Sequence, residues 1–191
     1  MGLRIALGAL VALAALTFAA TASAHARISP PVALAKELQV FTLAVPTEKE
    51  NARTTTIELT PPAGFSIDSF IPAAGWKRSV QQTGSGDGAV IQKVTWSGGS
   101  VPTGEDSAFS FLASTAASKT YTFSVRQTYS DGSIVEWTGP EASDSPAPIV
   151  KAVSSLGGGT STLDIIALAL AATALIVAVV GLLARGGRTL A

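Results

Sequence analysis

The sequence contains no cysteine, and its only methionine is Met1. Without cysteine the chain can form no disulfide and no zinc site of the Cys/His type. Histidine is nearly as scarce, because His25 is the only one. A Ser–His–Asp triad would need His25 as its base, and no Gly-x-Ser-x-Gly motif presents a nucleophilic serine. We therefore expect a protein that is not an enzyme.

Charged residues are also few, at 14% of the chain. Ten of the 13 Lys/Arg and all 13 Asp/Glu lie between residues 25 and 164, which gives this part a formal charge of −3. No basic patch stands out, so nucleic acid is not an expected partner.

The first 24 residues have the features of a secretory signal peptide. Arg4 precedes an apolar run, and small residues follow as far as Ala22-Ser23-Ala24. This order of charged, apolar and small residues predicts cleavage after Ala24, since the Ala-x-Ala pattern suits the peptidase. An uncleaved membrane anchor is the less favoured alternative.

A second apolar run, from Ile165 to Ala184, carries no charge. As a helix it would span about 30 Å, the thickness of the hydrocarbon core of a bilayer. Arg185 and Arg188 follow it, and positive residues favour the cytoplasmic side. We expect a single-pass membrane protein with a short cytoplasmic tail at 185–191 and an extracytoplasmic N-terminal domain.

Between these segments the pattern is one of short strands separated by turns. Apolar and polar residues alternate in "ARTTTIELTPP" and "KTYTFSVRQTY", and turn residues occur at Gly86-Asp87-Gly88 and Asp131-Gly132. A helical period is confined at most to a few residues at 33–38. The expected fold is all-β, an immunoglobulin-like antiparallel β-sandwich over residues 25–150.

The segment after Trp137 is expected to differ from the strands before it. "SDSPAPIV" predicts a last strand at a sheet edge, because its prolines cannot donate hydrogen bonds within a sheet. Residues 151–164 contain "SSLGGGTST" and are expected to form a flexible tether between the domain and the membrane helix.

Cleavage after Ala24 would place His25 at the mature N-terminus. An N-terminal histidine offers a metal its α-amine and its ring Nδ1 together, and both groups lose their protons near neutral pH. Two nitrogen donors suit Cu(II) well, and the expected mature chain, which lacks Met1, contains no sulfur and hence no soft ligand for Cu(I). The residues alone leave a second interpretation open, since some residue must follow any cleavage site.

Five motifs in order then resemble the YcnI-like family of bacterial extracytoplasmic copper-binding proteins. They are "AHARISP", the Val-Pro-x-Glu segment in "FTLAVPTEKENARTTTIEL", "AAGWK", "VTWSGGSVPTGEDSAFSF" and "YSDGSIVEWTGPEASDSPAPIV". The resemblance covers nearly all of the expected mature domain. It implies a copper site of the monohistidine type, in which an N-terminal histidine, a glutamate and a tryptophan surround Cu(II).

Carried over to this chain, the resemblance assigns the metal to His25, Glu48 and Trp137. Glu58 is the alternative carboxylate, because it projects from the outer face of its strand, and Glu136 ranks third because strand alternation turns it away from Trp137. The Trp137 indole either closes the core at the end of its strand or faces a surface site, and both alternatives stay open, whereas Trp76 and Trp96 are expected in the core.

The function expected from these features is Cu(II) binding in copper handling, as a chaperone, buffer or sensor. Other copper-trafficking proteins are the expected partners. One alternative is a metal-free immunoglobulin-like module that binds another protein at the cell surface. A copper monooxygenase is less favoured, because such enzymes use a second histidine.

Overall fold

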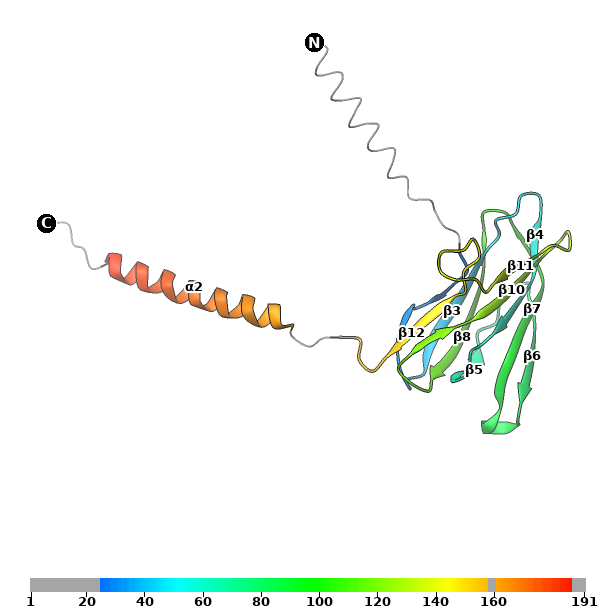
Figure 1. Ribbon diagram of the computed structural model, residues 1–191, viewed down its shortest axis with the longest axis horizontal. Coiled ribbons are helices and arrows are strands. Elements are labelled where there is room, and N and C mark those ends of the chain that lie inside the picture. The colour runs from blue at the N-terminus through cyan, green and yellow to red at the C-terminus, as the bar shows by residue number, and fades with distance from the viewer. Residues whose placement is uncertain (1–24, 158–160, 187–191) are drawn as a thin grey trace, which may run out of the picture. The chain divides into compact units, whose positions relative to one another are not determined.

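The computed structural model describes residues 25–157 and 161–186 (Figure 1). The expected signal peptide at 1–24 and residues 187–191 of the expected tail lie outside the described residues. The chain divides into two compact units, the first ending at Ser155 and the second beginning at Leu156.

Two antiparallel sheets form most of the first unit. The first sheet has the order β1-β3-β8-β5, with β1 (Arg27–Ser29), β3 (Gln39–Pro46), β8 (Asp106–Thr115) and β5 (Phe65–Phe70). The second has the order β11-β10-β4-β7-β6, with β11 (Ile134–Trp137), β10 (Ser124–Tyr129), β4 (Arg53–Thr60), β7 (Val90–Pro102) and β6 (Lys77–Thr83). The expected immunoglobulin-like β-sandwich is confirmed.

A small third sheet has the order β2-β12-β9, with β2 (Val32–Leu34), β12 (Ile149–Val153) and β9 (Thr120–Thr122). Two expectations fail here. Residues 32–34 form a strand that pairs in parallel with β12 instead of starting a helical turn. In addition, β12 is central rather than an edge strand, because Pro146 and Pro148 precede it and leave its own amides free to pair on both sides.

The core lies between the two large sheets, where apolar residues alternate along the strands. Ile57 and Leu59 of β4 are fully buried, and on β7 the Trp96 ring stacks on Phe109 of β8 with ring centroids 4.3 Å apart. The expected core position of Trp96 is confirmed, whereas Trp76 is only partly buried at the edge of the core.

The alternation in "KTYTFSVRQTY" also continues as expected, although the chain changes sheets within it. The alternate residues from β9 to the end of β10 are all buried, namely Tyr121, Phe123, Val125, Gln127 and Tyr129. Gln127 differs from the other four residues, because its side chain is an amide that is fully buried among apolar and aromatic side chains.

The expected turns join neighbouring strands. Gly86–Gly88 forms a short 3-10 turn (η1) in the β6–β7 hairpin. Gly132, with a φ of 82°, follows Asp131 between β10 and β11, where a positive φ favours glycine.

The second unit contains one helix, α2 (Thr162–Gly186). Ser161 and Asp164 form a capping box, since the Ser161 hydroxyl accepts the Asp164 amide at 3.1 Å and the Asp164 carboxylate accepts the Ser161 amide at 2.8 Å. Residues Thr162–Leu182 are long and apolar enough to cross a membrane. Because β12 extends to Val153, the linker expected from residue 151 begins later, and the helix begins earlier than residue 165.

Candidate metal centre

His25 lies at the entry to β1, where the chain joins the edge of the first sheet. Its side chain is half-buried, and its ring contacts Trp137 edge-on, with ring centroids 6.5 Å apart and an interplanar angle of 63°. The next residue, Ala26, is buried in the core, and β1 pairs with β3 over three residues. The position of His25 is therefore set by the start of a paired strand.

Trp137 ends β11 and is fully buried. Its indole Nε1 donates to the Gln127 Oε1 at 2.9 Å. Of the two alternatives for this indole, the structure has the first, because the ring belongs to the core. His25 is nevertheless in contact with it, as the assignment of both residues to one site requires.

Glu48 follows β3 in an exposed loop. Partial desolvation raises the pKa of its carboxyl group, while the positive charge of His25 lowers it in opposition. The pKa of Glu48 therefore responds to a charge on His25, although the two residues are far apart in the sequence.

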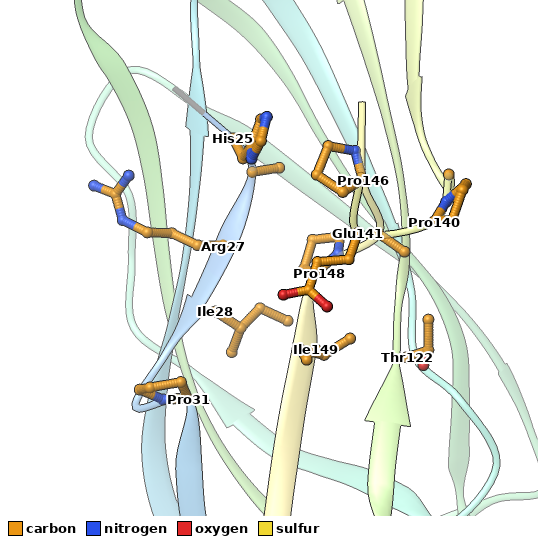
Figure 2. Close-up of a pocket in the computed structure, with 13 residues that line it drawn as sticks. His25, Arg27, Ile28, Pro31, Thr122, Pro140, Glu141, Pro146, Pro148 and Ile149 are labelled. Atoms are coloured by element: carbon orange, nitrogen blue, oxygen red, sulfur yellow. The ribbon is translucent and has the colours of Figure 1, made fainter. Parts of the chain in front are cut away.

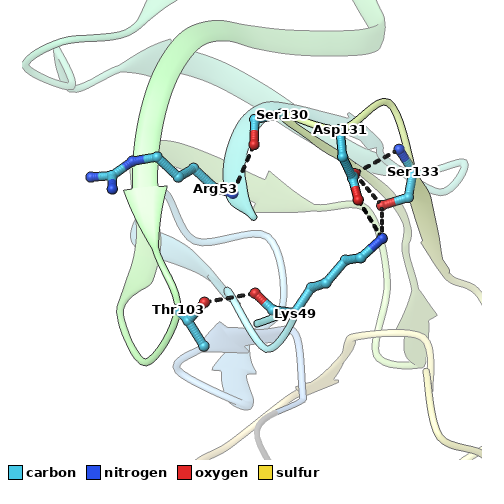
Figure 3. Close-up of polar contacts among 6 residues, drawn as sticks. All are labelled: Lys49, Arg53, Thr103, Ser130, Asp131 and Ser133. Carbon is cyan, nitrogen blue, oxygen red and sulfur yellow. Dashed lines mark hydrogen bonds and ion pairs between the residues drawn. The ribbon is translucent and has the colours of Figure 1, made fainter. Parts of the chain in front are cut away.

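The loop that carries Glu48 is held on several sides (Figure 3). The Lys49 ammonium group forms an ion pair with Asp131 and donates to the Ser133 hydroxyl at 2.8 Å. The Lys49 carbonyl accepts the Thr103 hydroxyl at 2.6 Å. Lys49, the residue next to Glu48, is therefore restrained by contacts with two other loops.

Tyr129 adds a contact from below this loop. Burial raises the pKa of its phenol group, while hydrogen bonds from the backbone of Glu48 and Lys49 lower it in opposition. Tyr129 is buried at the end of β10, and it lines the same pocket as Glu48 and Lys49, so this strand end lies close to the loop.

The alternative carboxylates lie on another surface. Glu58 pairs across β4 and β10 with Arg126, which in turn pairs with Glu136 on β11. Glu58 forms an ion pair with Lys93 at 3.3 Å, and Glu136 forms one with Arg126 at 3.3 Å. Both carboxylates project from the sheet face opposite to the buried Trp137, so the structure does not bring Glu58 or Glu136 to His25.

His25 also lines a cleft of about 440 Å³ between β1 and the segment that leads into β12. Figure 2 shows the Glu141 carboxylate directed into this cleft between Ile28 and Ile149. Glu141 is not among the carboxylates that the sequence singles out. The structure makes it a further carboxylate on the His25 side of the domain.

The donors available at this end are few. Within residues 25–157 and 161–186, no group of three or more His, Cys, Asp or Glu side chains could hold a metal ion. A centre built on His25 would therefore draw on the α-amine as well as the side chains. That donor set, two nitrogens and a carboxylate oxygen, suits Cu(II).

Comparisons with known proteins agree with this organisation. The family described as a domain of unknown function (DUF1775) matches residues 25–152. The Bacillus subtilis (strain 168) protein named copper-binding protein CutI is 34% identical over 189 residues, which cover 89% of this chain and 90% of that protein.

A crystal structure of an uncharacterised Nocardia farcinica protein, described as having an immunoglobulin-like fold, is also similar. It is 31% identical, with a TM-score of 0.58, and the match covers 69% of this chain and 99% of that one. The family match begins at His25 itself and ends within β12, so it spans the described sandwich. The chain therefore belongs to the DUF1775 family, the YcnI-like family that its motifs resemble.

Proposed function

We propose that this protein binds Cu(II) outside the cytoplasm and serves in copper handling as a chaperone, buffer or sensor. Copper would be held by the α-amine and Nδ1 of His25 and by the Glu48 carboxylate, with Trp137 beside it. One observation carries the proposal: the residue at which the family match begins is in contact with Trp137 and interacts electrostatically with Glu48. The copper-binding name of the Bacillus relative supports it.

The chemistry of the donors favours the oxidised ion. An amine and an imidazole of one residue close a chelate ring, and a carboxylate adds a hard oxygen donor. The chain after Ala24 contains no Cys or Met, so it supplies no soft sulfur ligand that would favour Cu(I). The site is thus suited to hold Cu(II) and not to cycle between oxidation states.

The buried indole supports the same function. Trp137 occupies one side of the His25 ring and is itself inaccessible to water. An aromatic ring beside the metal excludes a water ligand from that side and interacts favourably with positive charge. Transport or storage of copper follows more readily from such a site than oxygen activation.

Helix α2 would tether the domain to the membrane. Its apolar stretch is long enough to span a bilayer, and the arginines after it favour an inside C-terminus. The sandwich would then lie on the extracytoplasmic side, where signal-peptide cleavage exposes the His25 amine.

The proposal is tested with the chain of residues 25–191 in detergent, released from a fusion so that its first amine is free. Cu(II) binding is measured by competition with a chelator of known affinity, for wild type and His25→Ala. We expect one tight site in wild type and its loss in His25→Ala, with unchanged thermal unfolding of the copper-free chain. Stoichiometric tight binding by folded His25→Ala would refute the site.

A further inference from the structure

We propose that Gln127 is a positioning residue that fixes Trp137 and the Glu48 segment relative to each other. The inference rests on the proposed function, because it concerns the geometry of the same copper site. It adds a residue that is hydrogen-bonded to Trp137 and to the carbonyl of Pro46, two residues before Glu48.

The Gln127 side chain is fully buried, and every part of its amide group is used. Its Oε1 accepts the Trp137 indole N–H at 2.9 Å. Its Nε2 donates to the Pro46 carbonyl at 2.8 Å and to the Thr54 Oγ1 at 2.7 Å. One side chain on β10 therefore connects β11, β3 and β4.

The connection continues to the residue before Glu48. The hydroxyl groups of Thr47 and Thr54 are 2.6 Å apart, and both side chains are buried. The Pro46 carbonyl and the Thr47 side chain are thus both bound within this network. Together they determine where the chain leaves β3 and where Glu48 begins its loop.

Burial makes these bonds effective restraints. A buried polar group left without a partner loses its hydration without compensation, so rotation of the Gln127 amide or of the Trp137 indole is strongly disfavoured. A network with every member satisfied holds its side chains in one arrangement. The indole that contacts His25 is therefore held in a fixed position relative to the start of the Glu48 loop.

Burial of a polar side chain alone does not produce such a network in this fold. The hydroxyl oxygens of Ser107 and Thr115 are also buried, yet neither has a hydrogen-bond partner among the described residues. Thr115 lies at the far end of β8, where it pairs with Phe65. It supplies a control position that is buried and polar but separate from the site.

The test uses Cu(II) as the probe and the free-amine chain of residues 25–191 in detergent. Gln127→Leu and the control Thr115→Val are compared with wild type, below the unfolding temperature of each. Supporting residues around a metal site typically contribute 10- to 100-fold in metal affinity. We expect Gln127→Leu to weaken Cu(II) binding at least ~10-fold and to alter the Cu(II) electron paramagnetic resonance spectrum, and Thr115→Val to change neither.

A second arm separates positioning from general destabilisation. If Gln127 acts by placing Glu48, its replacement matters less once the Glu48 carboxylate is gone. The affinity losses of Gln127→Leu and Glu48→Gln should therefore be non-additive in the double variant. A purely structural role predicts lower thermal stability with additive affinities and an unchanged spectrum.

The outcomes distinguish the two proposals. If the wild-type protein does not bind Cu(II) through His25, the proposed function itself is refuted. If the wild-type protein binds Cu(II) and folded Gln127→Leu has the same affinity and spectrum, only the positioning role is refuted. Should Gln127→Leu not fold, Gln127→Glu replaces it, because a carboxyl group cannot donate to both Pro46 and Thr54. A wild-type affinity and spectrum in that variant would equally overturn the inference.

Discussion

At the scale of single residues, the surroundings of Glu48 and Glu58 decide which carboxylate is available to a metal. Glu58 is paired with Lys93 on the outer sheet face. A charge on His25 would lower the pKa of Glu48, which lies in a restrained loop. Glu141 is a second carboxylate on this side, because it lines the same cleft as His25. Glu48 is the one that the family resemblance assigns to the metal.

We therefore expect Glu48→Gln to weaken Cu(II) binding at least ~10-fold, because it removes the charged oxygen donor while keeping the shape of the side chain. Glu58→Gln is the matched control and should leave the affinity unchanged. Glu141→Gln tests the carboxylate of the cleft beside His25 in the same way. Chelator competition measures the Cu(II) affinity of all three variants. If Glu58→Gln or Glu141→Gln bound Cu(II) more weakly and Glu48→Gln did not, the carboxylate ligand would be that residue and not Glu48.

Asp131 gives a residue-level prediction about pH. Hydrogen bonds from Lys49 and Ser133 hold the pKa of its carboxyl group well below the ordinary value of 3.8. A carboxyl with a lowered pKa in the folded state stabilises the fold above its ordinary pKa, and this contribution is lost as the pH falls through the folded pKa. We expect Asp131→Asn to lower the thermal unfolding temperature at neutral pH, with a difference from wild type that shrinks below about pH 4.

The control for this experiment is Asp68→Asn on β5. Asp68 is exposed and forms no ion pair with another described residue. Its replacement should leave the pH profile of unfolding unchanged. If Asp131→Asn had the same effect at acidic and neutral pH, the Lys49 contact would not contribute through charge.

At the scale of elements, strands with strict alternation are the ones the sequence predicts. The segments at β8, β10 and β11 have an inward-facing residue at every second position, and most of these residues are apolar. On β4 the alternation holds from Ile57 to Leu59. The pattern for β6 is mostly polar, because Val80 is the one apolar residue of this edge strand and the other six side chains are exposed. Three-residue strands such as β1 and β2 are too short to show a period.

The residues of the candidate site also differ in how far the sequence predicts them. The cleavage motif points to His25, and the family resemblance points to Glu48 and Trp137. The role of Gln127 follows only from the register of β10 against β11 and β4, which brings side chains from three strands together. Periodicity shows that Gln127 faces inward, but no local pattern states which groups it bonds.

The β6–β7 hairpin supplies a prediction at this scale. Gly99 lies on β7 directly beneath the Trp76 ring, and a Cβ added there would overlap that ring. Trp76 is in turn packed edge-on against Phe109, with centroids 4.9 Å apart. We expect Gly99→Ala to lower the free energy of unfolding by about 1–3 kcal/mol, the usual cost of overpacking.

Denaturant unfolding measures this cost, and Gly88→Ala is the control. Gly88 lies in the η1 turn, and a Cβ built there meets no described atom within 4 Å. Its replacement should change stability little. Equal stability of Gly99→Ala and wild type would show that Trp76 can leave β7 without cost.

At the scale of the whole molecule, the sandwich and α2 are separate compact units. The helix provides an apolar stretch of membrane length, and the sandwich brings the His25 ring against Trp137. The sequence predicts both units from hydropathy and strand pattern. It places the end of the sandwich a few residues too early, because the last strand continues to Val153 before the Gly/Ser/Thr-rich residues begin.

The central claim is that signal-peptide cleavage creates a copper ligand. It is tested most directly by Cu(II) electron paramagnetic resonance on two chains, one beginning with a free His25 amine and the other with Ala24 before it. Our account predicts a single tight site with hyperfine structure from two nitrogens in the first chain, and loss of that site in the second, whose His25 amine is an amide. Equal binding and equal spectra in the two chains would contradict it.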